Sequence, residues 1–169
     1  MDVFDSIRTV LAVRQYADRP VPHEVVRKVV EAGQLTGSSK NEQPWHFITV
    51  ERPETLRALG EVATSGRYVA GAAFAVAVAV ERESIYGVSD GSRAVQSMVL
   101  AAWEEGVGSN WIGFANLEPV EEILGVPDGY DILALLSFGY PTQQLGRGKK
   151  RRKPLGEVAS SERFGTPFA

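Results

Sequence analysis

The chain has 169 residues, 44% of them hydrophobic, which is enough for one domain with a sizeable core, and its formal net charge is -3. It contains no cysteine and only two histidines, which excludes disulfides, zinc–thiolate sites, iron–sulfur clusters and thiol nucleophiles and argues against a histidine-rich metal site. The acidic balance gives no overall case for binding nucleic acid or acidic membranes.

The first half of the chain is expected to be mostly helical. Hydrophobic periodicity predicts a helix over residues 3–11, a second over 23–35, a strand over 45–50 and a third helix over 53–63. Two prolines in RQYADRPVP, at 14–22, separate the first two helices. The polar loop SSKN, at 38–41, follows Gly37 and precedes the strand.

The second half alternates irregularly between strands and helices. The run AAFAVAVAV at 72–80 is typical of a strand buried in mid-sheet, and it is too short to span a bilayer. A loop to Gly91, a long apolar helix over 92–103, a strand over 110–114, a helix over 118–124 and a strand over 132–138 are expected next. We therefore predict an α+β fold, a sandwich of helices about one central sheet.

Beyond residue 141 the sequence loses its periodicity. Residues 147–153 read RGKKRRK and hold six of the 18 Lys and Arg residues, so the rest of the chain is strongly acidic. A basic run of this kind is usually solvated, but it can also bind nucleic acid. The irregular tail, 160–169, holds Phe164 and Phe168, which suggests docking onto a surface such as that of a second subunit. The N-terminus lacks the features of a secretion signal, so we expect a cytoplasmic location.

No hydrolase triad, P-loop or dinucleotide-binding glycine motif is readable. The remaining polar positions offer cations for a phosphate, hydroxyl and amide groups for a polyol, and bare backbone near a planar ring, as a nucleotide-like cofactor needs. They are Arg14, Ser38, Ser39, Asn41, Gly113, Lys150 and Arg152. Ordinary roles remain open for all of them, as turn formers, a bulge glycine and solvated surface cations.

Five segments together resemble the FMN-dependent nitroreductase family. In the family's order, they are RQYADRPVP at 14–22, SSKNEQPWHFITV at 38–50, GVGSNWIG at 106–113, FGYP at 138–141 and RKPL at 152–155. The resemblance spans nearly the whole chain, which looks like a small, short-chain member. It implies a three-layer sandwich with a central mixed β-sheet flanked by helices, in an intertwined homodimer. Residues 1–169 would form a single domain, with the basic segment and tail at 142–169 packing on the partner subunit.

The resemblance also implies which residues bind FMN. Arg14 would reach the flavin's pyrimidine edge or ribityl chain, where a cation would stabilise negative charge on the reduced ring. Lys150 and Arg152 would hold the phosphate. Ile112 and Gly113 would lie beside the central edge of the ring, with a backbone N–H near Gly113 bonding to N5.

The SSKN loop would serve the flavin of the other subunit. The resemblance implies that Ser38, Ser39 and Asn41 come from the partner and line the same flavin, while Pro44 and Trp45 anchor the loop to the sheet. Because the flavin mediates the reaction, no side chain is expected to act as a catalytic acid or base.

The sequence departs from the family just before residue 13. The family usually has Arg-Arg-Ser where this chain has Val10, Leu11 and Ala12, so a phosphate-binding arginine and a serine hydroxyl are missing. Either the basic cluster compensates or the affinity for flavin is reduced. Arg8 is a candidate substitute.

The expected function is that of an FMN-dependent NAD(P)H oxidoreductase in which NADH or NADPH reduces the flavin at N5 and a nitroaromatic, quinone or related acceptor then reoxidises it. The expected partners are a second copy of the chain and the small-molecule acceptor, with no nucleic acid and no membrane. Three alternatives stay open. They are a flavin- or nucleotide-binding protein with little turnover, a nucleic-acid-associated protein acting through the basic arm, and a flavin-dependent reductive removal of a substituent.

Overall fold

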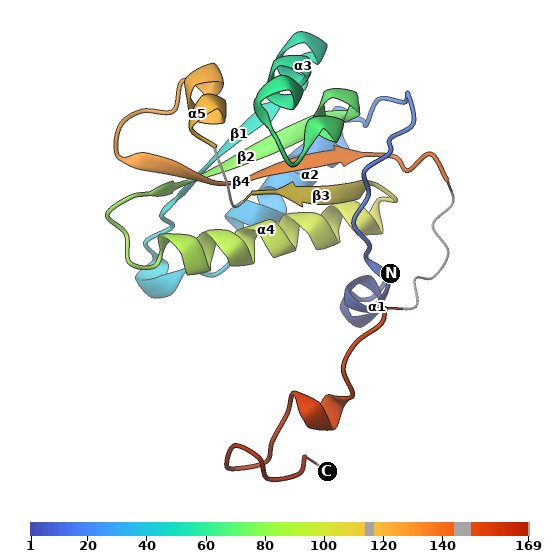
Figure 1. Ribbon diagram of the computed structural model, residues 1–169, viewed down its shortest axis with the longest axis vertical. Helices are drawn as coiled ribbons and strands as arrows, with labels where there is room; N and C mark the ends of the chain where they lie inside the picture. Colours follow the sequence, from blue (N-terminus) through green and yellow to red (C-terminus); the bar gives the residue numbers. More distant parts are fainter. Residues whose placement is uncertain (114–116, 144–149, 169) are drawn as a thin grey trace.

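The computed structural model describes residues 1–113, 117–143 and 150–168. Figure 1 shows three layers, with a sheet between two pairs of helices. One face of the sheet carries α2 (His23–Gln34) and α4 (Gly87–Glu104), and the other carries α3 (Pro53–Val62) and α5 (Glu118–Leu124). The predicted α+β sandwich is therefore confirmed.

The sheet has four strands in the described part of the chain. They are β1 (Trp45–Val50), β2 (Phe74–Glu81), β3 (Gly108–Ile112) and β4 (Tyr130–Gly139), and their spatial order is β1-β2-β4-β3. All three neighbouring pairs are antiparallel. Within the described residues, parallel pairing is limited to an isolated bridge between Ala12 and Ser109, at the outer edge of β3, so the expected mixed sheet is mixed only through this bridge.

The central strand β2 is buried on both faces, as its apolar sequence predicts. Its larger side chains, Phe74, Val76 and Val78, pack in the core shared with α2 and α4. Its alanines at 75, 77 and 79 pack in the core on the side of α3 and α5. The period of two in a strand therefore assigns large residues to one layer and small residues to the other.

The helix expected at 92–103 begins five residues earlier, at Gly87, so the predicted loop up to Gly91 is wrong. A β-carbon at Gly91 would lie only 2.7 Å from Leu133 Cδ2 and 2.8 Å from Val80 Cγ1. Gly91 therefore permits the first turns of α4 to pack closely on the sheet. Glycine in a helix can serve close packing as well as termination, and the sequence alone does not separate the two uses.

The first helix, α1 (Val3–Thr9), and the C-terminal segment are the most exposed parts of the fold. Val3 and Phe4 of α1 are exposed over about 72% and 73% of their surface. Figure 1 shows the C-terminal segment running past α1 and away from the three layers. This segment contains a short 3-10 turn, η3 (Leu155–Glu157), and further along it Phe164 is fully exposed. No helix in the described ranges is long and apolar enough to cross a membrane.

We predict that Phe138→Ala destabilises the protein by about 3–5 kcal/mol, because it removes a large side chain from a packed core. Phe138 is fully buried and stacks on Phe74, with 4.6 Å between ring centroids. Urea unfolding would measure the loss. Ile85→Ala is the control, since Ile85 is 86% exposed, and its effect should stay within about 0.5 kcal/mol. Equal losses for the two variants would contradict this view of the core.

Candidate functional site

An open groove of about 1160 Å³ lies between α1, α4 and the edge strand β3. Its apolar wall consists of Phe4, Ile7, Val10, Leu11, Ala12, Val95, Val99 and Trp111. Its polar residues are Gln96, Ser109, Asn110, Arg8, Lys150 and Arg152. Among the described residues that line it there are three cations and no carboxylate, so the groove suits a ligand with an apolar body and an anionic end.

The floor of the groove depends on a close approach of the chain to the edge of the sheet. The Val13 amide donates a hydrogen bond of 2.8 Å to the Ser109 carbonyl, which adds the segment 12–13 to the outer edge of β3. A β-carbon at Gly108 would lie 2.3 Å from Val13 Cγ2. Glycine at 108 therefore lets the N-terminal segment lie directly against the strand and places residues 8–12 beside the groove.

The cations lie where the C-terminal segment meets α1. Lys150 Nζ donates to the Ile7 carbonyl at 2.5 Å, and Arg8 forms an exposed ion pair of 2.6 Å with Asp5. Partial burial, and then the charge of the neighbouring Arg152, hold the pKa of Lys150 below its ordinary value. A bound anion would relieve the repulsion between Lys150 and Arg152, which is the property expected of a phosphate site. Arg147 and Lys149 of the basic cluster lie outside the described residues.

Arg14 lies beside the groove and does not line it. Its guanidinium carbon is 5.9 Å from the centre of the Tyr68 ring, in the short turn η2 (Arg67–Gly71). The Tyr68 hydroxyl in turn accepts a hydrogen bond of 2.7 Å from Asn110 Nδ2, and Asn110 lines the groove. Sequence reasoning missed this link through Tyr68, because residues 14, 68 and 110 are far apart along the chain.

Tyr16 fixes the segment that carries Arg14. Its hydroxyl lies 2.8 Å from the Val13 carbonyl, to which it can donate, and 2.7 Å from Ser137 Oγ. A β-carbon at Gly139 would lie 2.8 Å from the Tyr16 ring, so the ring packs directly on the backbone of β4. Burial raises the pKa of Tyr16 far above its ordinary value, which the hydrogen bond with Ser137 only partly offsets.

The end of β3 combines a buried side chain with a glycine. The Ile112 side chain is 2% exposed and belongs to the core, so only its backbone could meet a ligand. A β-carbon at Gly113 would lie 2.7 Å from Trp111 Nε1. Glycine there leaves room for the indole and keeps the backbone bare, as a residue beside a planar ring requires.

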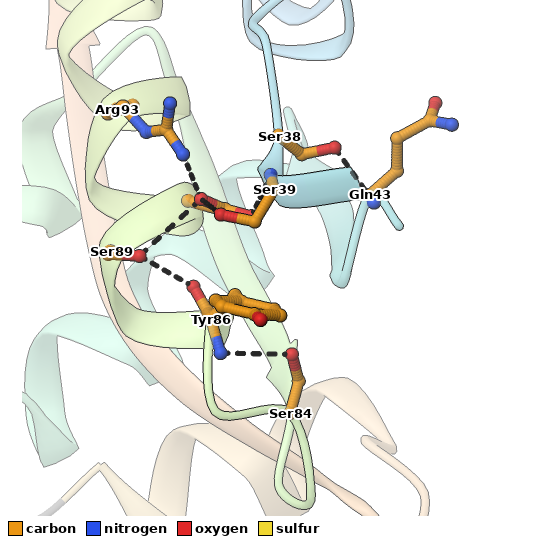
Figure 2. A network of polar contacts seen from close by, with 8 residues as sticks. Ser38, Ser39, Gln43, Ser84, Tyr86, Ser89 and Arg93 are labelled. Carbon is orange, nitrogen blue, oxygen red and sulfur yellow. Dashed lines mark hydrogen bonds and ion pairs between the residues drawn. The ribbon is translucent and has the colours of Figure 1, made fainter. Parts of the chain in front are cut away.

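The SSKN loop does not line the groove of its own chain. It contains the short turn η1 (Ser39–Asn41) and lies against the first turns of α4. Figure 2 shows Ser38 and Ser39 in this loop, with Ser39 bonded towards the helix that carries Ser89 and Arg93. The loop joins the sheet as expected, because the Glu81 amide donates to the Pro44 carbonyl at 3.1 Å and Trp45 pairs with Val80.

The partner of Ser39 in α4 is Asp90, which sequence reasoning missed. Asp90 is fully buried, and its carboxylate accepts a hydrogen bond of 2.8 Å from the Ser39 amide. A usable signal was present, since an acidic residue such as Asp90 is typical of the first turn of a helix. A helix that begins at Ser92, as the periodicity predicts, leaves Asp90 in the preceding loop.

The structure thus brings only part of the predicted site together. Lys150 and Arg152 share the groove with residues 10–12, whereas Arg14 and the backbone at 112–113 lie at its border. The three polar residues of the SSKN loop lie elsewhere on the same chain. Among the described residues, no three His, Asp or Glu side chains gather as a candidate metal site.

Comparison with known proteins was consistent with this geometry. The model described as "Nitroreductase family" matches residues 8–84 and 67–140. A protein of Methanothermobacter thermautotrophicus, provisionally named NADH dehydrogenase/NAD(P)H nitroreductase, is 33% identical over 154 residues, which cover 86% of this chain and 81% of the relative.

Two solved structures are also similar. One is a provisionally assigned nitroreductase of Desulfovibrio desulfuricans in complex with FMN, with 29% identity, a TM-score of 0.82 and coverage of 97% of this chain and 98% of the other. The second is an FMN-dependent nitroreductase of Clostridium difficile, with 25% identity, a TM-score of 0.85 and coverage of 96% and 100%.

We predict that Tyr16→Phe lowers the free energy of unfolding near neutral pH by about 1 kcal/mol, the usual net value of a hydrogen bond. In the unfolded chain Tyr16 ionises near pH 10, whereas the raised pKa keeps it protonated in the fold. Its contribution is therefore complete below about pH 10 and is lost as the pH rises further. In urea unfolding above pH 10, the free energy of unfolding should fall less steeply with pH for Tyr16→Phe than for the wild type. The control variant Tyr130→Phe should show the same fall as the wild type.

Proposed function

This chain belongs to the nitroreductase family, and we propose that it is an FMN-dependent NAD(P)H oxidoreductase that works as a homodimer. The observation that carries the proposal is the groove at the edge of β3, which combines an apolar wall with Arg8, Lys150 and Arg152 and, among its described lining residues, no carboxylate. That combination suits a flavin mononucleotide, which has a flat, largely apolar ring at one end and a phosphate at the other.

The phosphate would be held by the cations of the groove. Lys150 and Arg152 would supply charge-assisted hydrogen bonds, and Arg8 would take the place of the arginine that the family usually has before residue 13. Val10, Leu11 and Ala12 would contribute only apolar contact there. The loss of the Arg-Arg-Ser sequence is therefore offset by cations from α1 and from the C-terminal segment.

The remaining residues would orient the ring. Arg14, held beside Asn110 through Tyr68, would place positive charge near the pyrimidine edge and favour the anionic form of the reduced ring. The bare backbone at Ile112 and Gly113 would offer an N–H to the central edge. When bound, FMN would supply the redox chemistry, a hydride transfer through N5 from NADH or NADPH to a nitroaromatic, a quinone or a related acceptor.

The homodimer is supported by surfaces that a single chain leaves uncovered. Val3 and Phe4 of α1 are mostly exposed, and so are Leu155 and Phe164 of the C-terminal segment. The SSKN loop has no place in the groove of its own chain, so Ser38, Ser39 and Asn41 would line the flavin of the partner subunit. The segment 142–169 would pack on that subunit as well.

The first test is an absorption spectrum of the purified protein after addition of FMN and removal of the excess. We expect flavin bands that disappear with NADH or NADPH under anaerobic conditions and return with air or with a quinone. Bands that resist reduction would identify a flavin-binding protein without turnover. A protein that takes up no FMN would contradict the proposed function.

Removing the cations proposed to bind the phosphate should weaken the binding of FMN and leave the binding of riboflavin unchanged. We predict that Lys150→Ala/Arg152→Ala raises the Kd for FMN at least about tenfold, because each charge-assisted hydrogen bond is worth roughly 1.5–3 kcal/mol. Riboflavin, which lacks the phosphate, should bind the variant and the wild type equally. Arg8→Ala should act in the same direction.

Arg52→Ala/Arg57→Ala is the control that matches this loss of two cations, since both arginines are exposed at α3, on the opposite face of the sheet. It should leave the Kd for both ligands unchanged in a fluorescence titration. Equal losses of FMN and riboflavin binding in Lys150→Ala/Arg152→Ala would show that these cations support the fold and not the phosphate.

A further inference from the structure

The SSKN loop has an unusual backbone. Lys40, Asn41 and Gln43 have positive φ angles of 52°, 58° and 52°. Residues other than glycine adopt this region infrequently, at some cost in strain, although asparagine tolerates it better than most. Such strain persists only where the surroundings fix it, and it clusters at functional sites. The loop therefore needs an anchor.

Asp90 is that anchor. Its buried carboxylate accepts hydrogen bonds from the Ser39 amide at 2.8 Å and from the Ser39 hydroxyl at 3.2 Å. From within α4, Ser89 Oγ lies 3.4 Å from the same carboxylate, and Arg93 pairs with it. Figure 2 shows Ser39 of the loop close to Ser89 and Arg93 of α4.

The electrostatics keep this anchor charged. Burial alone would raise the pKa of Asp90, but the hydrogen bond from the Ser39 amide and the neighbouring Arg93 outweigh it and hold the pKa below its ordinary value. An ionised carboxylate makes stronger hydrogen bonds than a neutral acceptor does. Half of the Arg93 side chain is exposed, so Arg93 compensates the charge at the surface while Asp90 stays buried against the loop.

The anchor also decides which hydrogen bonds the two serines can offer. The Ser39 hydroxyl donates its proton to Asp90, so its oxygen presents acceptor capacity towards a ligand. Ser38 Oγ accepts a hydrogen bond of 3.0 Å from the Gln43 amide, so its own proton remains available to donate. The loop thus offers an acceptor and a donor at adjacent positions, which suits a polyol such as a ribityl chain.

We propose that Asp90 is a positioning residue that holds the SSKN loop in the shape needed to complete the flavin site of the partner subunit. This inference rests on the proposed function, and it adds to that function a buried carboxylate that does not line the groove of its own chain. Asp90 acts on the flavin only through Ser39 and the strained backbone that follows it.

The first test compares Asp90→Asn with Asp128→Asn. Asparagine keeps the shape of the side chain but removes its charge, so the Ser39 bonds weaken and the loop loosens. We expect the Kd for FMN to rise about tenfold in Asp90→Asn, the loss expected for one hydrogen bond to a charged group. Asp128 is exposed in the turn before β4, and its variant should bind FMN as the wild type does. Amide hydrogen exchange should accelerate at residues 38–43 in Asp90→Asn alone.

Mixed dimers distinguish positioning from a general loss of stability. One chain would carry Asp90→Asn and the other Lys150→Ala/Arg152→Ala, each with a different affinity tag for isolation of the mixed dimer. One of the two sites then combines an intact groove with an intact loop from the partner, and the other combines both defects. We expect one FMN per mixed dimer at wild-type affinity, whereas dimers with a single kind of chain bind weakly at both sites.

Two outcomes would overturn the inference alone. One is a wild-type protein that binds FMN together with an Asp90→Asn variant of unchanged affinity. The other is a mixed dimer in which both sites stay weak, which would show that Asp90 supports the fold or that the loop serves its own groove. A wild-type protein that takes up no FMN would instead remove the proposed function, and this inference with it.

Discussion

The burial of β2 on both faces is the constraint on which the rest of the structure depends. A strand with core on both sides must be covered by helices in both directions, which produces the three layers. Its two neighbours, β1 and β4, occupy its hydrogen-bonding edges, and β3 is left as an outer strand. An outer strand has backbone N–H and C=O groups that no neighbouring strand pairs with, and here the segment at 12–13 pairs with some of them. The groove is a consequence of this arrangement.

The helix α4 separates the two halves of the candidate site. The middle of the helix contributes Val95 and Val99 to the groove, while its first turn carries Asp90, which holds the SSKN loop. One chain therefore presents a groove and a loop that do not meet each other. In the proposed homodimer each groove would receive the loop of the other chain, so that dimer formation and flavin binding would depend on the same surfaces.

The departure at Val10, Leu11 and Ala12 becomes easier to understand in three dimensions. These residues form part of the apolar wall, so the groove has lost polar contacts on that side. Positive charge in the groove comes instead from Arg8 in α1 and from Lys150, which donates a hydrogen bond to the last turn of that helix. In the proposed function Arg8 would replace the missing arginine, while Lys150 and Arg152 would hold the phosphate at the positions that the family resemblance implies.

The sequence by itself determined the fold class, the central position of β2 and the bounds of β1 and α5, because these follow from local periodicity and from the burial that an apolar strand requires. It also identified the candidate cations and the loop, through their order along the chain. Only the tertiary structure decided that α4 begins at Gly87, that Arg14 lies over Tyr68 beside the groove, and that Asp90 binds Ser39. Those facts depend on contacts between residues distant in sequence. The sequence alone does not distinguish a glycine or an aspartate in a loop from one in a closely packed helix.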